Sequence, residues 1–369
     1  MTTANDQAHM SAALALAERG LGDTWPNPSV GCVLVKDGVV VGRGTTQSGG
    51  RPHAETVALE RAGSAAKGAT AYVSLEPCSH HGKTPPCADA LIAAGIVRVV
   101  TGATDPDPRV SGGGLAKLRQ AGIQVDAQGP WQGRANALNR GFFLAKTAGR
   151  PLFALKTATG LDGRIAMASR ESRWITGPQA RRMGHLLRAR FDAILVGSGT
   201  VLADDPELTC RLEGYGGRPK VRVVLDRRLR TPAGSKLAKT AKTVPTWVLT
   251  TPGGAQQGQA LANMGVELIV VENTANGGAF AAAAAQILAK RGLTRVLVEG
   301  GGNVAASLLD VGLVDEIAWF RANRVMGGDG LPAISGLAIG KLADTPAFKL
   351  AYSLSLGPDR LDMLDRAPT

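Results

Sequence analysis

A histidine, a glutamate and two cysteines in the first quarter of the chain have the types and order of a metal site. They are His53 and Glu55, separated by one residue, then Cys78, which follows Pro77, and finally Cys87. One imidazole and two thiolates suit zinc and leave the fourth tetrahedral position for water, and zinc lowers the pKa of that water enough to generate hydroxide near neutral pH. Glu55, at the start of an expected helix, would move protons beside the metal. The alternative is that these side chains are ordinary packing residues.

The spacing of the two cysteines makes the motif more specific. The order His-x-Glu followed by Pro-Cys is typical of zinc-dependent nucleobase deaminases, in which the second cysteine follows three residues after the first. Here it follows nine residues after, so segment 79–86 must form a loop beside the metal. We expect Lys83 on this loop to bind a phosphate, because a cation near the pocket suits that anion. His80 and His81 either face the substrate as well or are simply solvated.

Three glycine clusters follow expected strands in the second half of the chain, in segments 196–200, 299–303 and 327–330. Glycines at a strand end let the backbone approach a pyrophosphate, and a following helix offers its first amides to the anion. The clusters do not match G-x-G-x-x-G with an acidic residue about 20 positions on, so a Rossmann domain is not supported. The glycines therefore predict a dinucleotide site of another kind, with structural turns as the alternative.

Strands and helices alternate along the chain, which indicates an α/β layered architecture. In the first half we expect helices at 12–18, 53–62, 88–94 and 115–121, and strands at 30–35, 39–41, 72–75, 97–101 and 123–125. Segment 146–151 has the composition of a linker. In the second half we expect strands at 152–156, 193–196, 221–225, 246–249, 267–271 and 295–299, and helices at 179–190, 279–291 and 304–309. The predicted domains are residues 1–148 and 149–369.

The composition agrees with a globular chain of two domains. Its length of 369 residues exceeds the roughly 100–200 residues of one domain. Hydrophobic residues make up 44% and charged residues 20%, which excludes a disordered or fibrous protein. With only four cysteines, no secretory signal and no apolar run of about 18 residues, we expect a cytoplasmic protein.

The net charge of +12 is unevenly distributed. Up to Ala148 there are 14 basic and 11 acidic residues, a net charge of +3, which leaves +9 for the remainder. A basic chain can bind nucleic acid, but phosphorylated small molecules account for the charge equally well. The aromatic content of 4% argues against the stacking surfaces of single-strand binders. The uneven split favours a dinucleotide and a sugar phosphate in the second half.

Four stretches of the first half resemble the deaminase half of the bifunctional riboflavin-biosynthesis deaminase/reductase family. They are Pro-Asn-Pro-Ser-Val-Gly at 26–31, Pro-His-Ala-Glu at 52–55, Leu-Glu-Pro-Cys-Ser-His at 75–80 and Lys-Thr-Pro-Pro-Cys at 83–87. The resemblance implies a cytidine-deaminase-like α/β/α layered domain with one zinc ion. It would remove the 2-amino group of a diaminopyrimidinone ribosylamino 5′-phosphate, and the implied substrate contacts are Asn27, Lys83 and Asp105.

Segments 156–164, 174–177, 192–206 and 298–301 resemble the reductase half of the same family, which has a dihydrofolate-reductase-like α/β fold. The resemblance implies NADPH-dependent reduction of the ribosyl group to ribityl, with hydride delivered to C1′. The residues that would hold NADPH are Ala158, Trp174, Thr176, Thr200, Asp204, Gly300, Gly301, Gly302 and Asn303. Those that would hold the substrate are Ser172, Arg188, Leu208, Arg211 and Glu299, with Lys156 and Asp162 near the reacting carbon. The two arginines suit a 5′-phosphate, because guanidinium pairs with it bidentately.

The chain departs from the family pattern at several positions. Asp107 stands where the family usually has asparagine, and segment 44–50 lacks the usual histidine or other aromatic residue. Arg170 replaces a usual glycine, so a positive φ there would strain the backbone. Arg227 and Arg228 are either readers of the NADPH 2′-phosphate or a solvated pair at a strand end.

Three other side chains are expected outside the chemistry. Cys32 lies in an apolar strand and is predicted to be a buried thiol, while His185 and Cys210 are predicted to be packing or rim residues. The family suggests a homo-oligomer with no membrane or nucleic-acid partner. Two rival functions are a nucleic-acid deaminase and a degenerate deaminase kept as a zinc-stabilised scaffold.

Overall fold

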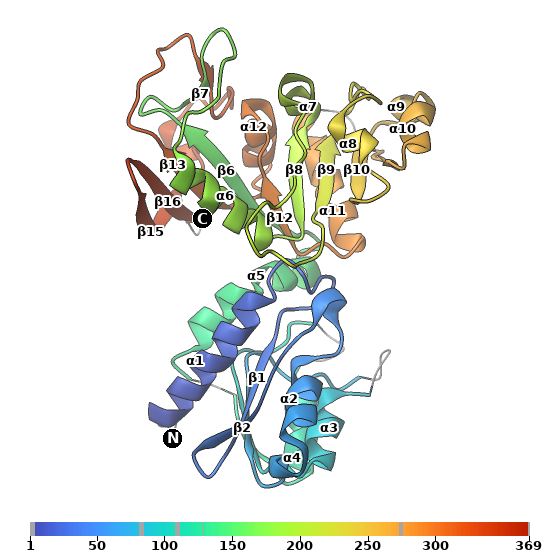
Figure 1. Cartoon of the computed structure of the whole chain (residues 1–369), viewed down its shortest axis with the longest axis vertical. Coiled ribbons are helices and arrows are strands. Elements are labelled where there is room, and N and C mark those ends of the chain that lie inside the picture. Colours follow the sequence, from blue (N-terminus) through green and yellow to red (C-terminus); the bar gives the residue numbers. More distant parts are fainter. Residues whose placement is uncertain (1–3, 81–84, 108–110, 128, 273–275, 368–369) are drawn as a thin grey trace. The chain divides into compact units, whose positions relative to one another are not determined.

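The computed structural model describes residues 4–80, 85–107, 111–127, 129–272 and 276–367. The chain divides into two compact units, Met1–Arg150 and Pro151–Thr369. Each unit is built around its own sheet (Figure 1). Within the described ranges, no helix is long and apolar enough to cross a membrane.

The first unit contains a five-stranded mixed sheet in the order β2-β1-β3-β4-β5. Its strands are β1 (Gly31–Lys36), β2 (Val39–Thr45), β3 (Thr70–Val73), β4 (Arg98–Thr101) and β5 (Gln124–Asp126). β1 pairs antiparallel with both β2 and β3, whereas β3, β4 and β5 are parallel. The carboxyl ends of β3 and β4 therefore lie at one edge.

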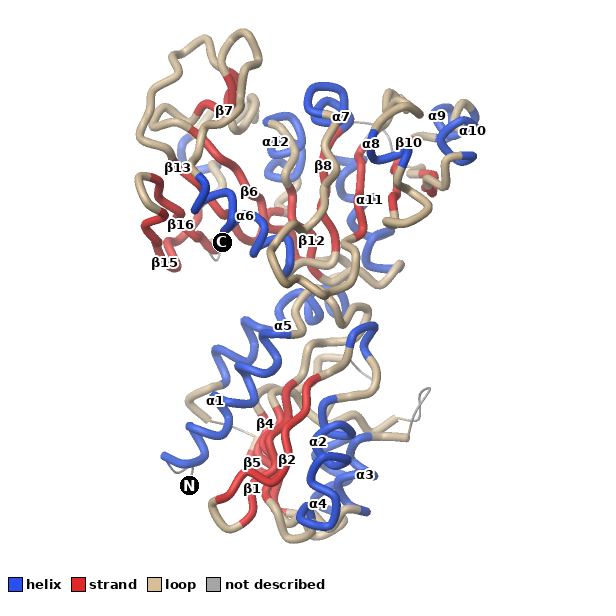
Figure 2. Tube along the Cα trace, in the orientation of Figure 1, coloured by secondary structure: helices blue, strands red, loops and turns tan. Residues whose placement is uncertain are grey.

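Helices cover both faces of this sheet, as Figure 2 shows. The helices are α1 (Ala4–Arg19), α2 (Ala54–Ala62), α3 (Cys87–Ala93), α4 (Gly113–Gln120) and α5 (Gln132–Thr147), with short 3₁₀ turns at Ser48–Gly50 and Gly63–Ala66. α1 packs with α5, and α2 and α4 both pack with α3. A Cβ on Gly31 would lie 1.9 Å from the carbonyl oxygen of Ala13, so only glycine allows α1 to approach β1 this closely. The predicted buried thiol of Cys32 is confirmed, since it is 0% exposed in this core.

The second unit contains a nine-stranded sheet in the order β11-β10-β9-β8-β12-β6-β13-β16-β15. Its strands are β6 (Leu152–Thr159), β8 (Ala193–Gly197), β9 (Val221–Leu225), β10 (Thr246–Thr250), β11 (Glu267–Val270), β12 (Arg295–Val298), β13 (Val314–Arg321), β15 (Phe348–Leu356) and β16 (Asp359–Arg366). The neighbours from β11 to β13 are parallel, and β16 and β15 continue the sheet in antiparallel pairing. A separate ribbon joins β7 (Arg164–Ala166) to β14 (Leu331–Pro332).

The helices of the second unit mostly follow its parallel strands. They are α6 (Pro178–Ala189), α7 (Ser198–Asp204), α8 (Lys236–Lys239), α9 (Pro252–Gln256), α10 (Gln259–Asn263), α11 (Gly277–Lys290) and α12 (Gly302–Asp310), with a 3₁₀ turn at Leu342–Asp344. Runs of buried β-branched residues form the central strands, as expected where helices cover both faces of a parallel sheet. The predicted α/β alternation is confirmed in both units.

Several parts of the structure differ from the sequence prediction. The short helices α7–α10 and the strands β7 and β14 were not predicted. α1 begins at Ala4 rather than at residue 12. α5 was not predicted, because its glycines and asparagines disfavour helix, yet burial of Leu138 and Phe142 stabilises it. The antiparallel strands β13, β16 and β15 were also not predicted, because the pairing of β13 with β6 joins residues more than 150 positions apart.

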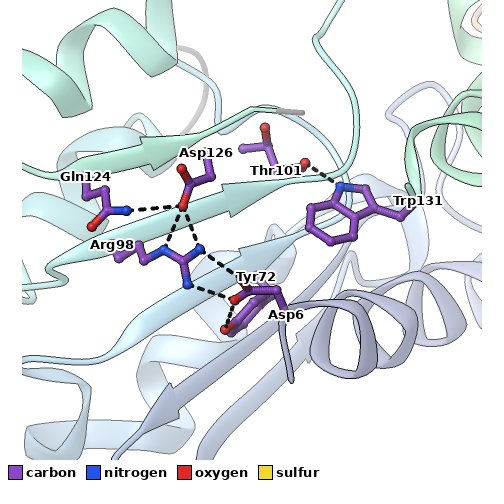
Figure 3. A network of polar contacts seen from close by, with 7 residues as sticks. All are labelled: Asp6, Tyr72, Arg98, Thr101, Gln124, Asp126 and Trp131. Carbon is purple, nitrogen blue, oxygen red and sulfur yellow. Dashed lines mark hydrogen bonds and ion pairs between the residues drawn. The ribbon is translucent and has the colours of Figure 1, made fainter. Parts of the chain in front are cut away.

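A buried charge network ties α1 to the sheet of the first unit (Figure 3). One carboxylate oxygen of Asp6 accepts hydrogen bonds from the Tyr72 hydroxyl and from Arg98, both at 2.7 Å. Arg98 also donates to Asp126 of β5 at 2.7 Å. The Asp6 side chain is 1% exposed, so its carboxylate charge is compensated by these hydrogen bonds instead of by solvent. On the same unit the indole of Trp131 donates to the carbonyl of Thr101.

We predict that Asp6→Ala lowers the local unfolding free energy of α1 and β3–β5 by about 2–3 kcal/mol, because it removes the acceptor of the Tyr72 hydroxyl and one of the two carboxylates that pair with Arg98. Arg134→Ala is the control: it removes an exposed ion pair with Glu18 and should cost less than about 1 kcal/mol. Hydrogen exchange followed by mass spectrometry measures both changes. Equal losses in the two variants would contradict the prediction.

Candidate functional site

The first unit brings the three predicted metal ligands together. His53 is the extended residue that precedes α2, and Cys87 is the first residue of α3. The Nδ1 atom of His53 lies 3.3 Å from the Cys87 sulfur and 3.8 Å from the Cys78 sulfur. All three donor atoms lie within 4.8 Å of one another. One imidazole and two sulfurs at this spacing fit a zinc ion and leave one tetrahedral position for water or substrate.

The site stabilises the thiolate form of one of its two cysteines, Cys78. The hydrogen bond from Cys87 lowers the pKa of Cys78 to about 4, and contact with His53 adds to this against the cost of burial. The Cys87 backbone N–H also donates to the Cys78 sulfur at 3.3 Å. The side-chain hydrogen bond between the two cysteines raises the pKa of the Cys87 thiol, so Cys78 carries the thiolate of the pair. Zinc binding requires thiolates, and one is already stabilised here.

Glu55 lies in the first turn of α2, two residues from His53, and its side chain is buried. Burial raises the pKa of this carboxyl to about 7, while the neighbouring His53 acts in the opposite direction. A carboxyl with this pKa can accept and release a proton near neutral pH, as a general acid–base group must. Glu55 is therefore suited to proton transfer beside the metal ligands.

Asn27, a predicted substrate contact, lies in the loop before β1. Its amide nitrogen donates to the carbonyl oxygen of Gly50 at 2.8 Å. Gly50 has φ +86°, and a Cβ there would lie 2.6 Å from that nitrogen, so a side chain at position 50 would displace Asn27. The pair holds the Asn27 amide in one orientation.

The carboxylate of Glu76 binds four backbone amides, a role that the sequence did not predict. It accepts backbone N–H groups from Asp105, Gly112, Gly114 and Leu115 at 3.1–3.4 Å, and it is 3% exposed. These amides belong to the loop after β4 and to the start of α4. Because Glu76 stands two residues before Cys78, it fixes the loop of Asp105 beside the metal ligands. The Pro-Cys motif gave no signal for this role.

Asp105 and Asp107 both lie buried in that loop. An oxygen of Asp105 accepts the Asp107 N–H at 2.8 Å, and burial raises the pKa of Asp105 to about 6. The unusual acidic residue Asp107 forms an ion pair with Lys146 of α5 at 3.1 Å. Lys146 thus compensates the negative charge that Asp107 introduces in place of the family's usual asparagine. His80 is half-buried, whereas the predicted phosphate ligand Lys83 and its neighbour His81 lie outside the described residues.

The second unit has a cavity of about 480 Å³ beside β6 and α6. Seven predicted residues line it: Lys156, Ala158, Trp174, Thr176, Arg188, Arg211 and Glu299. The cavity wall also contains residues that sequence reasoning missed, among them Arg181, Arg182 and Phe320. The Arg181 guanidinium stacks on the exposed Trp174 ring at 4.6 Å and donates to the Thr176 carbonyl. The available signal was the spacing of Arg181, which lies seven residues before Arg188 on α6 and therefore on the same helix face.

Glu299 and Arg188 form a bidentate ion pair in the cavity wall, with N–O distances of 2.6 and 2.8 Å. The third nitrogen of Arg188 donates to the carbonyl of Thr209 at 2.8 Å. Although burial opposes ionisation of Glu299, Arg188 and Lys156 lower its pKa to about 2. Glu299 therefore offers a permanent carboxylate to donors on a ligand.

The predicted cofactor residues lie at the ends of adjacent parallel strands. β8 leads into α7, which carries Thr200 and Asp204, and the neighbouring β12 leads through Gly300 and Gly301 into α12. Both helices begin after glycine with no side-chain cap. A Cβ on Gly199 or Gly301 would meet no atom within 4 Å. Open, uncapped helix starts at one sheet edge fit the pyrophosphate of a dinucleotide.

The remaining predicted residues of this unit lie around these features. The Leu208 side chain is buried in the core, so a ligand could reach only its backbone. Asp162 accepts the Met326 and Gly327 N–H groups at 2.7 Å; these bonds outweigh desolvation and lower its pKa, so it joins two loops. Ser172 is half-buried. Gly302 and Asn303 form the first turn of α12.

Arg170 has φ +71°, so arginine occupies the left-handed backbone that glycine normally fills. The strain expected for this departure is therefore present in the loop after β7. Of the 2′-phosphate candidates, Arg228 is exposed and Arg227 lies 6.0 Å from the Phe280 ring. Arg230, which we did not predict, reaches the first residue of α7 and donates to the Ser198 hydroxyl at 2.7 Å.

Comparisons with known proteins match both units. The family model described as the RibD C-terminal domain matches residues 151–361, and the cytidine and deoxycytidylate deaminase zinc-binding region matches residues 3–103. The chain is 44% identical to riboflavin biosynthesis protein RibD of Escherichia coli over 367 residues, which cover 96% of this chain and 97% of that protein.

Solved structures agree over the whole length. RibD of Acinetobacter baumannii superposes with a TM-score of 0.88 at 38% identity, covering 99% of both chains. A diaminohydroxyphosphoribosylaminopyrimidine deaminase/5-amino-6-(5-phosphoribosylamino)uracil reductase from Thermotoga maritima gives a TM-score of 0.85 at 35% identity, covering 98% of this chain and 99% of that one.

A zinc-binding deaminase unit followed by an oxidoreductase unit defines a two-activity enzyme of pyrimidine metabolism. The chain belongs to the RibD family, and it is a bifunctional deaminase and NADPH-dependent reductase of riboflavin biosynthesis. The predicted cytidine-deaminase-like and dihydrofolate-reductase-like folds are confirmed. Substrates in this family are small phosphorylated pyrimidines.

We predict that Glu55→Gln lowers ammonia release by about 10²–10⁴-fold, because the amide cannot transfer the proton. Bound zinc should stay at one ion per chain, since the ligands are unchanged. Glu60→Gln, an exposed change on the same helix, is the matched control and should behave as the wild type. Steady-state ammonia assays and elemental analysis measure both properties. Full ammonia release by Glu55→Gln would refute the assignment.

The raised pKa of Asp105 predicts a pH-dependent effect of Asp105→Asn on stability. Because the folded pKa of about 6 exceeds the ordinary value of 3.8, this carboxyl stabilises the fold below pH 4, and that contribution is lost as the pH rises to 6. The unfolding free energy of the variant minus that of the wild type should rise by about 2 kcal/mol over this interval. Urea unfolding at several pH values measures the difference, and a difference that is independent of pH would contradict it.

Proposed function

We propose that this enzyme deaminates 2,5-diamino-6-ribosylamino-4(3H)-pyrimidinone 5′-phosphate and then reduces the ribosyl group of the product to ribityl. The product would be 5-amino-6-ribitylamino-uracil 5′-phosphate. The observation that supports this most is a pair of distinct sites on one chain: a metal-ligand cluster beside buried Glu55, and a basic cavity that contains the carboxylate of Glu299. The T. maritima protein, by its name, carries out both steps.

In the deaminase unit we assign His53, Cys78 and Cys87 to the zinc ion. Bound zinc supplies the Lewis acidity that makes water a nucleophile near neutral pH. Glu55 accepts a proton from the attacking water and gives it to the amino nitrogen at C2. The C2–N bond then breaks, ammonia leaves, and the second proton of the water moves to a ring nitrogen, so that a carbonyl remains on the ring.

The pyrimidine must be held with its C2 at the metal. We assign this positioning to Asn27, whose amide is oriented by Gly50, and to Asp105, whose loop is fixed by Glu76. Lys83 is assigned to the phosphate from its place in the motif alone. These contacts select a ribosylamino-pyrimidine phosphate over a free base.

In the reductase unit, bound NADPH supplies the hydride for C1′ of the ribosyl group. Cofactor binding is assigned to the strand-end residues Thr200, Asp204 and Gly300–Asn303, and to Ala158, Trp174 and Thr176 on the cavity side. The protein contributes orientation and charge, while the cofactor carries the chemistry.

The polar cavity wall is assigned to the substrate. Arg211 and Lys156 supply positive charge for the 5′-phosphate and the sugar, and Glu299 accepts hydrogen bonds from the ligand. Arg188, which already pairs with Glu299, acts by keeping that carboxylate charged and oriented. The backbone of Leu208, together with Ser172 and Asp162, completes the site from the surrounding loops.

We further propose that residues 1–148 form the deaminase domain and residues 149–369 the reductase domain of a cytoplasmic homo-oligomer. The open edge strand β15 supports self-association, since Leu350 and Tyr352 on it are each 51% exposed. Analytical ultracentrifugation that finds only monomers would contradict the oligomer, and cell fractionation tests the location.

Incubating the enzyme with the diamino substrate, first without and then with NADPH, tests the function. We expect ammonia release before the cofactor is added and NADPH oxidation only afterwards. Ammonia release with no later oxidation would contradict the reductase assignment. Deamination of single-stranded DNA in preference to the free nucleotide would contradict the substrate.

A further inference from the structure

The face of α6 that lines the reductase cavity carries one neutral polar side chain, His185, among cations. His185 lies three residues from Arg182 and from Arg188, and all three side chains line the cavity together with Lys156. Residues three apart on a helix share one face. The sequence alone predicted a packing or rim residue here, and the structure shows that the imidazole lies in the wall of the cavity.

One nitrogen of this imidazole is engaged by the protein. The backbone N–H of Arg211 donates to His185 Nδ1 at 3.2 Å, so Nδ1 must be the unprotonated nitrogen and the ring proton resides on Nε2. The Cys210 thiol donates to the His185 carbonyl at 3.3 Å, so two consecutive residues anchor their loop to this turn of α6. The tautomer is fixed by the fold.

The other nitrogen is free to bind a ligand. Within residues 4–80, 85–107, 111–127, 129–272 and 276–367, Nε2 of His185 has no hydrogen-bond partner. Burial, together with the charges of Arg188 and Arg211, lowers the pKa of this imidazole and keeps it neutral at physiological pH. Because His185 is half-buried in the cavity wall, this N–H donor is open to a ligand in the cavity.

We propose that His185 is a substrate-binding residue of the reductase, whose Nε2–H donates a hydrogen bond to an oxygen of the ribosyl group. The cations around His185 are suited to bind the phosphate, and the Glu299 carboxylate can only accept hydrogen bonds. The neutral Nε2–H donor of His185 is therefore suited to an uncharged oxygen of the sugar. The same ring fixes the backbone of Arg211, which connects sugar recognition to phosphate recognition. This proposal rests on the reductase function proposed above.

Two substitutions distinguish the role of the His185 Nδ1 atom from that of the Nε2 atom. His185→Asn keeps an acceptor near the Nδ1 position for the Arg211 N–H but removes the Nε2 donor. His185→Gln places an amide N–H near the Nε2 position. Cys210→Ala is the matched control, because it removes the other anchor of this loop and leaves the imidazole intact. Ammonia release by the deaminase unit of each variant shows that the chain is intact.

The measurement is NADPH oxidation with the deaminated intermediate, together with calorimetric binding of that intermediate in the absence of NADPH. We expect His185→Asn to raise the KM and Kd for the intermediate about tenfold, the loss of one hydrogen bond, without changing the KM for NADPH. His185→Gln should recover most of this loss, and Cys210→Ala should show none.

Unchanged KM and Kd in His185→Asn would overturn the proposal. So would an equal loss in Cys210→Ala, or a parallel rise in the KM for NADPH, since either would indicate a structural role. If the wild type binds the intermediate but does not oxidise NADPH, the reductase function fails, while the Kd values still decide whether His185 binds substrate. If the wild type does not bind the intermediate, both proposals fail.

Discussion

Parallel strand pairing is the constraint on which both functional sites depend. In the first unit β3 and β4 run side by side in the same direction, so the segments that follow them, with Cys78 and Asp105, meet at one sheet edge. In the second unit the parallel strands β8, β12 and β6 do the same for the start of α7, for Glu299 and for Ala158. Chemistry is thus assembled at carboxyl ends of strands from residues distant in sequence.

Several buried carboxylates among the described residues are compensated by hydrogen bonds or ion pairs, whereas burial raises the pKa values of Glu55 and Asp105. Glu76 accepts four amides, and Glu299 is paired with Arg188. Glu55 lies among the metal ligands with its pKa raised to about 7 by burial. Perturbed ionisation of this kind is typical of functional sites, and the place of Glu55 beside the metal ligands supports its proposed role in proton transfer.

The metal ligands could be predicted from sequence because residue type and order alone specify zinc chemistry. Glu76 could not, because its four partners come from a loop that tertiary structure brings to it. The pair of Asp107 and Lys146 was hidden for a similar reason, since Lys146 belongs to α5, a helix that packing stabilises despite weak local propensity. In the second unit two glycine clusters coincide with the starts of α7 and α12, whereas the antiparallel strands β13, β16 and β15 depend on non-local pairing.

In our proposal, deamination at one site precedes reduction at a second, independent site. NADPH oxidation by zinc-depleted enzyme is the direct test of this order and of this independence. With the diamino substrate, we expect oxidation only after zinc is restored, because the reductase acts on the deaminated product. With the deaminated intermediate supplied directly, we expect the wild-type rate without zinc. Oxidation of the diamino substrate by zinc-depleted enzyme would contradict the order, and failure with both substrates would contradict the independence of the two sites.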